Sequence, residues 1–286
     1  MANSINTNRG ALVALQTLNN TNKALETTQN RVNTGLKVSS AKDNGAIFAI
    51  ATSQRAEMGA QDAVKQSLQR GQSIVDVALA AGETVVDALT EMKSLAVAIQ
   101  DATADSDTET KLMADFDAIA KEVHSALAGA TFDGVNLFKA TAAGAPIEVS
   151  TNTSGGKFSL KAAGGAASAT ALAFGGTADA DAGTWTAAAA AADKRTAYTA
   201  ANVETALNAF TTTLADFGTK SKSLDRQLTF VGKMQDSLET GVGNLVDADL
   251  AKESARLTAL QTKQQLGVQA LSIANSSSSM LLGLFR

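Results

Sequence analysis

Residues 47–99 read IFAIATSQRAEMGAQDAVKQSLQRGQSIVDVALAAGETVVDALTEMKSLAVAI, and one face of this stretch repeats at alternating three- and four-residue intervals. That face is polar in its first third and apolar afterwards, at positions 47, 50, 54, 57, 61, 64, 68, 71, 75, 78, 82, 85, 89, 92, 96 and 99. The interval predicts one coiled-coil helix of ~54 residues, roughly 80 Å long. Gly71 and Gly82 are the positions at which this helix could bend or break.

The composition suits long, narrow helix contacts and excludes several kinds of chemistry. Of the 286 residues 45% are hydrophobic but only 4% are aromatic, and Pro146 is the single proline. A net charge of −4 argues against a dedicated nucleic-acid binder. Cysteine is absent and His124 is the one histidine, so thiolate metal sites and a histidine-based catalytic site lack their residues. We predict no enzyme activity and no cofactor, and no apolar run is long enough to predict a membrane span.

A weaker repeat precedes the long one and defines a shorter helix. Its positions are 11, 15, 18, 22, 25, 29 and 32, which include Leu15, Leu18, Leu25 and Val32 and the polar Asn22 and Gln29. Polar seam residues weaken a helix pair but help to fix its register, so this helix should need a partner. Gly35 is predicted to end it. Ser39 or Ser40 is predicted to cap the next helix, with Asp43 near its positive end.

The C-terminal third mirrors this plan. A strict repeat runs through positions 203, 207, 210, 214, 217, 221, 224, 228, 231, 235, 238 and 242. The phase slips near Gly241 and Gly243, and a new seam passes through Leu250, Leu257, Leu260, Gln264, Leu271 and Leu281. Two glycines with a phase change predict a joint between two helical segments.

The segments between the two repeats are shorter. A helix is predicted over 107–129, followed by a turn at Asp133-Gly134. Residues 141–194 are rich in Ala, Gly, Thr and Ser, with alternating runs at 147–149 and 158–160. These runs predict a small β or loop region on the surface, and a partly disordered linker is the alternative.

Together the patterns predict a mainly α fold, a long antiparallel coiled-coil rod formed by the N- and C-terminal arms with a small β- and loop-rich middle insertion. Three parts are expected. Residues 1–38 with 244–286 form an inner coiled-coil domain of terminal helices, 39–140 with 195–243 form a helical rod domain, and 141–194 form a variable surface region.

Several motifs make the chain similar to bacterial flagellins. Residues 5–8 (INTN), 31–38 (RVNTGLKV) and 40–46 (SAKDNGA) resemble the N-terminal signature of that family. Residues 244–253 (NLVDADLAKE), 264–267 (QQLG), 271–275 (LSIAN) and 284–286 (LFR) resemble its C-terminal signature. The resemblance covers about 1–140 and 195–286, and the short length resembles flagellins of alphaproteobacteria.

The resemblance implies a subunit that polymerises with itself into the extracellular flagellar filament for swimming. In the family the terminal helices line the inner tube, and they order on assembly. Packing roles then fall on Leu15, Leu18, Leu25, Val32, Leu250, Leu257, Leu260, Leu271, Leu281 and Phe285. The signatures around the two joints include Gly35, Lys42, Asp43, Asn44, Asp247 and Asp249. Implied partners are an export chaperone, the export apparatus, and the junction and cap proteins, with no nucleic acid or membrane and no cleaved signal peptide.

Two further expectations come from the family. O-glycosylation is common in it, and the exposed candidates are Thr151, Thr153, Ser154, Ser168, Thr170, Thr177, Thr184 and Thr186. Enterobacterial members carry a QRVRELAV stretch that contributes to recognition by an animal innate-immune receptor. Here 90–97 read TEMKSLAV, so Leu95 is kept but Glu91 stands where an arginine is expected. We expect this charge reversal to weaken receptor activation.

Some alternatives stay open from the sequence. Lys42-Asp43 fits a local cap or an intersubunit ion pair. The net positive first 40 residues, with Arg9, Arg31 and Lys37, fit a solvated face or contacts with acids, such as Asp247 and Asp249, of the paired terminal segment or of a neighbouring subunit. His124 fits a structural role. A hook–filament junction protein is the alternative within the same machine, and a cytosolic coiled-coil scaffold is the alternative of another class.

Overall fold

The computed structural model describes residues 8–139, 147–160, 172–179 and 183–283, and side chains as far as residue 276. The helices are α1 (Arg9–Thr34), α2 (Gly45–Asp101), α3 (Asp107–Gly129), α4 (Ala191–Ala197), α5 (Ala200–Val246) and α6 (Leu250–Gly283). The strands are β1 (Thr131–Phe132), β2 (Val135–Asn136), β3 (Ile147–Ser150), β4 (Lys157–Leu160), β5 (Thr177–Asp179) and β6 (Thr184–Thr186). Consecutive strands pair as three antiparallel hairpins. The predicted class, mainly α-helical with a small β-rich middle, is confirmed.

The chain divides into two compact units. The terminal unit comprises 1–58 and 236–286, and the central unit comprises 59–235. Helices α2 and α5 each contribute residues to both units. The division at 38 and 244 drawn from the sequence stays a prediction, because it refers to layers of an assembled filament rather than to compactness.

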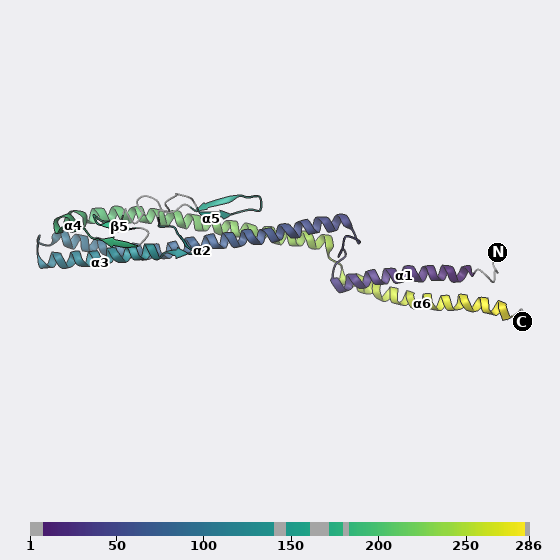
Figure 1. Ribbon diagram of the computed structural model, residues 1–286. Helices are drawn as coiled ribbons and strands as arrows, with labels where there is room; N and C mark the ends of the chain where they lie inside the picture. The colour runs from purple at the N-terminus through teal and green to yellow at the C-terminus, as the bar shows by residue number, and fades with distance from the viewer. Residues whose placement is uncertain (1–7, 140–146, 161–171, 180–182, 284–286) are drawn as a thin grey trace. The chain divides into compact units, whose positions relative to one another are not determined.

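The central unit is built on the apolar face of α2. Every seam position predicted from 61 to 99 is buried, and α2 passes through Gly71 and Gly82 as a continuous helix. Helix α5 runs antiparallel to α2, since Lys93 pairs with Glu204 at 3.2 Å and Gln235 Nε2 donates to Asp62 Oδ1 at 2.7 Å. Helix α3 lies along both, as Figure 1 shows. The long repeat in the sequence therefore encodes this core directly.

The glycines of α2 allow close packing instead of bending the helix. A Cβ at Gly82 would lie 2.2 Å from Leu214 Cδ2 on α5, and a Cβ at Gly71 would lie 2.6 Å from Val149 Cγ2 on β3. The backbone of Ser150 also donates to Ser67 Oγ at 3.1 Å. Glycine at 71 and 82 thus makes room for α5 and for the β3–β4 hairpin.

Two hairpins lie where the sequence indicated them. The turn between β1 and β2 has positive φ at Asp133 (50°) and Gly134 (74°), as a two-residue hairpin turn with Asp-Gly requires. The alternating runs at 147–149 and 158–160 form β3 and β4, with Val149 opposite Phe158. The sequence did not predict the β5–β6 hairpin or α4. Three-residue strands and a seven-residue helix are too short to show a period.

Two predicted seams are correct in only part of their positions. On α1 the partner-facing positions include Ala14, Thr21 and Thr28, whereas predicted positions 15, 22 and 29 are exposed. On α2 Ala51 and Met58 turn inward, and predicted positions 50 and 57 are exposed. On α1 the other predicted positions, 11, 18, 25 and 32, do face inward. Small residues at 14, 21 and 28 complete the inward face in place of 15, 22 and 29.

The C-terminal joint also lies later than expected. Helix α5 continues through Gly241 and Gly243 to Val246, and the break falls at 247–249. A Cβ at Gly243 would lie 2.8 Å from Asp247 Oδ2. This glycine leaves room for the turn that follows the helix and does not itself break the helix.

Candidate functional site

The paired terminal helices α1 and α6 carry most of the residues singled out in the sequence. They lie side by side (Figure 1), and three contacts along their length show that they run antiparallel. Asn8 Nδ2 donates to the Ala274 carbonyl at 2.7 Å, Gln264 Nε2 donates to Asn22 Oδ1 at 2.9 Å, and Arg31 pairs with Glu253 at 3.2 Å. Polar contacts therefore join the two helices along their length, and one of them connects the predicted polar seam members Asn22 and Gln264.

The apolar contacts of this pair are few. Leu18, Leu25, Val32, Leu257 and Leu271 are half-buried, and Leu260 is buried. Gly267 lies opposite Leu18, because a Cβ there would come within 3.2 Å of Leu18 Cδ1. Such a seam buries little apolar surface, so the pair gains little stability from packing alone.

Two predicted packing residues face away from the pair. Leu15 is 44% exposed and Leu250 is 49% exposed. Glu253 takes the inward position that the sequence assigned to Leu250, because it pairs with Arg31. The side chain of Leu281 and the whole of Phe285 lie outside the described residues.

Gly35 ends α1 as predicted. It has φ 71° and donates its backbone N–H to the Arg31 carbonyl at 2.9 Å, the left-handed cap that glycine favours. The chain after it then pairs with the end of α5. Lys37 N donates to the Val246 carbonyl at 2.6 Å, and Ala248 N donates to the Gly35 carbonyl at 2.9 Å. The two signature joints therefore form one structure in the terminal unit.

A small apolar cluster lies beneath these joints. Its buried members are Val38, Ala51, Val242 and Val246. Because the cluster draws on both ends of the chain, it anchors the 35–38 segment to the last turns of α5.

The caps differ from the predicted ones. Asn44 Oδ1 accepts from Ile47 N at 3.1 Å and caps α2, so Ser39 and Ser40 do not. Asp43 instead accepts from the backbone N–H and hydroxyl groups of Ser39 and Ser40. The backbone hydrogen bond from Ser40, with further bonds from both serines, lowers the pKa of Asp43. These contacts favour the local role for Asp43, while Lys42 is exposed.

The acids at the second joint also act locally. Asp249 Oδ1 accepts from Lys252 N at 3.1 Å and caps α6. Asp247 forms an isolated antiparallel bridge with Leu36. Arg31 contacts an acid of the paired terminal segment, which is one of the two alternatives left open from the sequence. That acid is Glu253, one turn beyond Asp249 along α6, and neither Asp247 nor Asp249.

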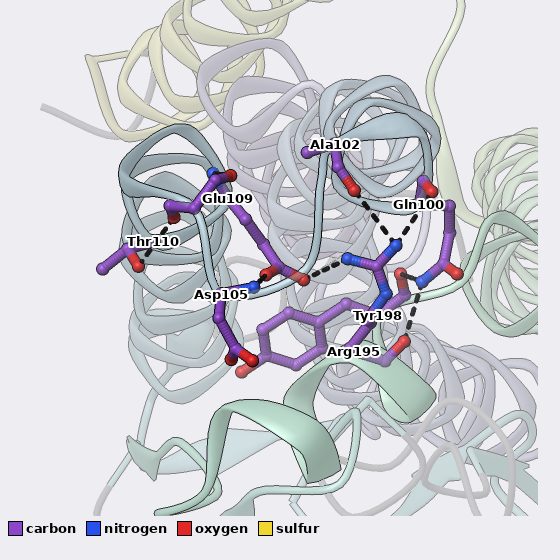
Figure 2. A network of polar contacts seen from close by, with 8 residues as sticks. Gln100, Ala102, Asp105, Glu109, Thr110, Arg195 and Tyr198 are labelled. Carbon is purple, nitrogen blue, oxygen red and sulfur yellow. Dashed lines mark hydrogen bonds and ion pairs between the residues drawn. The ribbon is translucent and has the colours of Figure 1, made fainter.

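A polar cluster in the central unit was missed from the sequence (Figure 2). Arg195 on α4 donates to the carbonyls of Gln100 and Ala102, each at 3.1 Å, and pairs with Glu109 on α3. The hydrogen bond from Arg195 is the largest cause that lowers the pKa of Glu109. One sequence motif, Ser106-x-x-Glu109, could have indicated the part of this cluster that lies at the start of α3. Ser106 Oγ accepts from Glu109 N at 3.1 Å, as in a capping box.

Next to this cluster, Tyr198 donates its hydroxyl to Asp117 at 2.6 Å, and Lys194 pairs with the same carboxylate at 2.5 Å. Burial, with a smaller contribution from Asp117, raises the pKa of Tyr198. The tyrosine ring stacks on Phe116 at 4.1 Å between centroids. These contacts hold α4 against α3, which is a structural role.

The comparisons with known proteins decide the family. The model of the bacterial flagellin N-terminal helical region matches residues 5–143, and that of the C-terminal helical region matches 200–285. The chain belongs to the bacterial flagellin family. Flagellins FljN and FljM of Caulobacter vibrioides are 52% and 50% identical to it, and a flagellin of Brucella melitensis is 41% identical. Each match covers 99% of both chains, so the chain is a flagellin of the short alphaproteobacterial type.

As a flagellin, the chain is a structural subunit of the flagellar filament. Its helical ends are the regions that the two family models match. Among the described residues no group of three or more His, Cys, Asp or Glu is placed to hold a metal ion. None of the described helices has the length and apolarity that a membrane span requires.

The remaining expected sites lie on the central unit. On α2 Glu91 is exposed and Leu95 is half-buried, and weak receptor activation stays a prediction. Five glycosylation candidates are exposed, namely Thr153, Ser154, Thr177, Thr184 and Thr186. Thr151 is half-buried, and Ser168 and Thr170 lie outside the described residues. Modification of these residues also stays a prediction.

The Arg31–Glu253 pair leads to a prediction about filament assembly. Arg31 Nε and Glu253 Oε2 are buried without a hydrogen-bond partner, so the pair is incompletely satisfied. Arg31→Met leaves the buried carboxylate of Glu253 unpaired, which should cost about 1–3 kcal/mol. We expect the critical concentration for polymerisation to rise about ten-fold for each 1.4 kcal/mol.

The double variant Arg31→Met with Glu253→Leu is the matched control. It removes both charges, so no unpaired charge remains. Its critical concentration should therefore return most of the way to the wild-type value. A double variant that assembles as poorly as Arg31→Met would contradict this account of the pair.

Proposed function

We propose that neighbouring copies of the chain join through the exposed apolar side chains of α1 and α6, and that these helices form the inner layer of the filament. The observation that carries this proposal is that exposed large apolar side chains are concentrated on α1 and α6. Among the described residues, seven of the eleven exposed large hydrophobics lie on these two helices. They are Leu12, Val13, Leu15, Leu250, Leu266, Val268 and Ile273.

The weakness of the α1–α6 contact supports the same proposal. Thr28 is the one residue of α1 that is fully buried among those described, and the pair relies on polar contacts. Helices with so little burial gain stability when neighbours cover their remaining apolar surface. In this proposal Leu15 and Leu250 contact other subunits, while Leu18, Leu25, Val32, Leu257, Leu260 and Leu271 pack within the subunit.

Membership of the family supports the wider setting that we propose. The chain acts outside the cell, as part of the filament, and reaches it through the flagellar export apparatus with the help of a chaperone. Junction and cap proteins meet the two ends of the assembled filament. Each of these partners is a proposal that co-purification with the full-length chain would test.

The test of the assembly surface is the double variant Leu12→Gln with Ile273→Gln. Their side chains are 58% and 69% exposed, so the substitutions should leave the subunit fold intact. If both side chains become buried between subunits, their loss should cost about 3 kcal/mol or more. We expect the critical concentration, measured by seeded light scattering and electron microscopy, to rise about a hundred-fold or more.

Asn19→Gln is the control, because Asn19 is also exposed on α1 but is polar. It should assemble at the wild-type concentration, and the thermal unfolding of the central unit should be the same in all three proteins. Filaments of the double variant at the wild-type concentration would rule out this surface.

A further inference from the structure

We propose that neutral His124 holds residues 172–179 and 183–186, including the β5–β6 hairpin, against helix α3. Protonation of His124 at acidic pH releases this segment. The proposal goes beyond assembly, since it concerns the central unit and a response of that unit to pH. It rests on the contacts, the burial and the hydrogen-bonding capacity of one side chain.

The imidazole of His124 joins α3 to two parts of this segment. Its Nε2 lies 3.2 Å from the Leu172 carbonyl, and its ring stacks on Trp185 of β6, with centroids 6.3 Å apart and planes at 10°. Trp185 in turn donates its Nε1–H to the Ala173 carbonyl at 2.7 Å. The histidine therefore lies where the incoming chain and the hairpin meet α3.

The hairpin backbone is also close to α3. A Cβ at Gly183 would come within 2.3 Å of Ala128 Cβ and 3.4 Å of the His124 carbonyl. His124 is 1% exposed, and Leu172 and Trp185 are buried with it. Water therefore has no access to the ring while the hairpin is in place.

The hydrogen bonding of the ring determines its charge. A carbonyl oxygen only accepts, so Nε2 must carry the proton that is donated to Leu172, and Nδ1 of the neutral ring is left with its lone pair. Nδ1 is buried and has no hydrogen-bond partner. Protonation would place a charged N–H at this atom, buried and without an acceptor, which is far more costly than an unused lone pair.

No nearby charge offsets this cost among the described residues. On α3 Lys121 and Glu122 are exposed, and Asp117 is already engaged by Lys194 and Tyr198. Asp179 on β5 is exposed and has an interaction of its own. Residues 172–176 and β6 contribute no charged side chain.

The sign of the pH effect follows from this environment. Burial lowers the pKa of His124 below its ordinary value of 6.5, and the bond to Leu172 opposes this only in part. The held state keeps the ring neutral, and the released state exposes it to water. The segment is therefore held most strongly above pH 6.5. As the pH falls below 6.5, the free energy that holds the segment decreases, and it stops decreasing once the pH is below the pKa of His124 in the held state. Within that interval each pH unit multiplies the ratio of released to held segment by about ten.

The chain provides its own reporters, because it has one histidine and one tryptophan. The full-length protein would be titrated from pH 8 to pH 4.5, with acrylamide quenching of Trp185 fluorescence as the readout. We expect quenching to increase below pH 6.5 while the far-ultraviolet circular dichroism of the long helices stays constant. The NMR titration of the single imidazole in the same protein should give a pKa below the ordinary histidine value of 6.5.

His124→Gln is the test variant, since its amide can donate to Leu172 but does not titrate. It should keep Trp185 protected across the whole range. Glu122→Gln removes an exposed carboxylate on the same turn of α3 and should behave like the wild type. An imidazole that titrates at or above 6.5, or the same increase in quenching in His124→Gln, would overturn the proposal. If His124→Gln does not fold, the NMR titration of the wild type decides alone.

Discussion

Phe210→Ala will lower the free energy of unfolding of the central unit by about 3–5 kcal/mol. Phe210 on α5 has no exposed surface, and its ring stacks on Phe138 at 5.5 Å between centroids. Few aromatic residues support this long, narrow core, so the surrounding chain has little with which to fill the cavity. Urea unfolding of the full-length monomer, followed by circular dichroism, measures the loss.

Phe230→Ala makes the same chemical change on the same helix and is the control. Phe230 is 57% exposed, so its replacement should change the free energy of unfolding by no more than about 0.5 kcal/mol. Equal losses in the two variants would mean that the rings contribute through helix propensity and not through the core. Phe210→Leu, which keeps most of the volume, should fall between the two if Phe210→Ala does not fold.

Gly183→Ala should detach the β5–β6 hairpin from α3. Gly183 has φ 65°, which costs an alanine about 1–2 kcal/mol. The new Cβ would also lie 2.3 Å from Ala128 Cβ, and neither atom can move without its backbone. The hairpin must therefore shift, and we expect Trp185 to become accessible to acrylamide at neutral pH.

Gly155→Ala is the control for a positive-φ glycine replaced without a clash, in the turn between β3 and β4. Gly155 has φ 88° but nothing within 4 Å of the position that a Cβ would take, so only the backbone cost applies. Trp185 should stay protected in that variant. Ala128→Gly combined with Gly183→Ala should return the hairpin to α3, because it removes the atom that clashes. Continued exposure of Trp185 in this double variant would show that backbone strain alone displaces the hairpin.

The two predictions differ in how far the sequence could have led to them. Phe210 lies on a predicted seam, so its burial follows from the repeat through α5. The role of Gly183 does not, because it depends on α3, which is more than 50 residues away in the chain. A glycine in a Gly- and Ala-rich segment has no distinguishing pattern of its own.

For the candidate site the sequence led to the correct helices and to most of the packing residues, but not to the orientation of Leu15 and Leu250, which face away from the pair. The 3–4 repeat located α1 and α6, and the signature motifs led to the family. Contact of the basic residues near the N-terminus with acids such as Asp247 and Asp249 was one open alternative, and the acid that Arg31 contacts is Glu253. The choice depends on how far α6 has turned when it passes Arg31, and a joint of three residues leaves that open.

The sequence by itself determined the long helix α2, the seam of α5, the helix end at Gly35 and the two alternating runs that form β3 and β4. Each of these depends on neighbours within a few residues, or on a period that large apolar side chains mark clearly. The tertiary structure decided that small residues face α6 from α1, that Arg195 joins three segments, and that His124 lies under Trp185. These contacts join distant parts of the chain through small or polar side chains, whose partners are set by three-dimensional packing and not by local pattern.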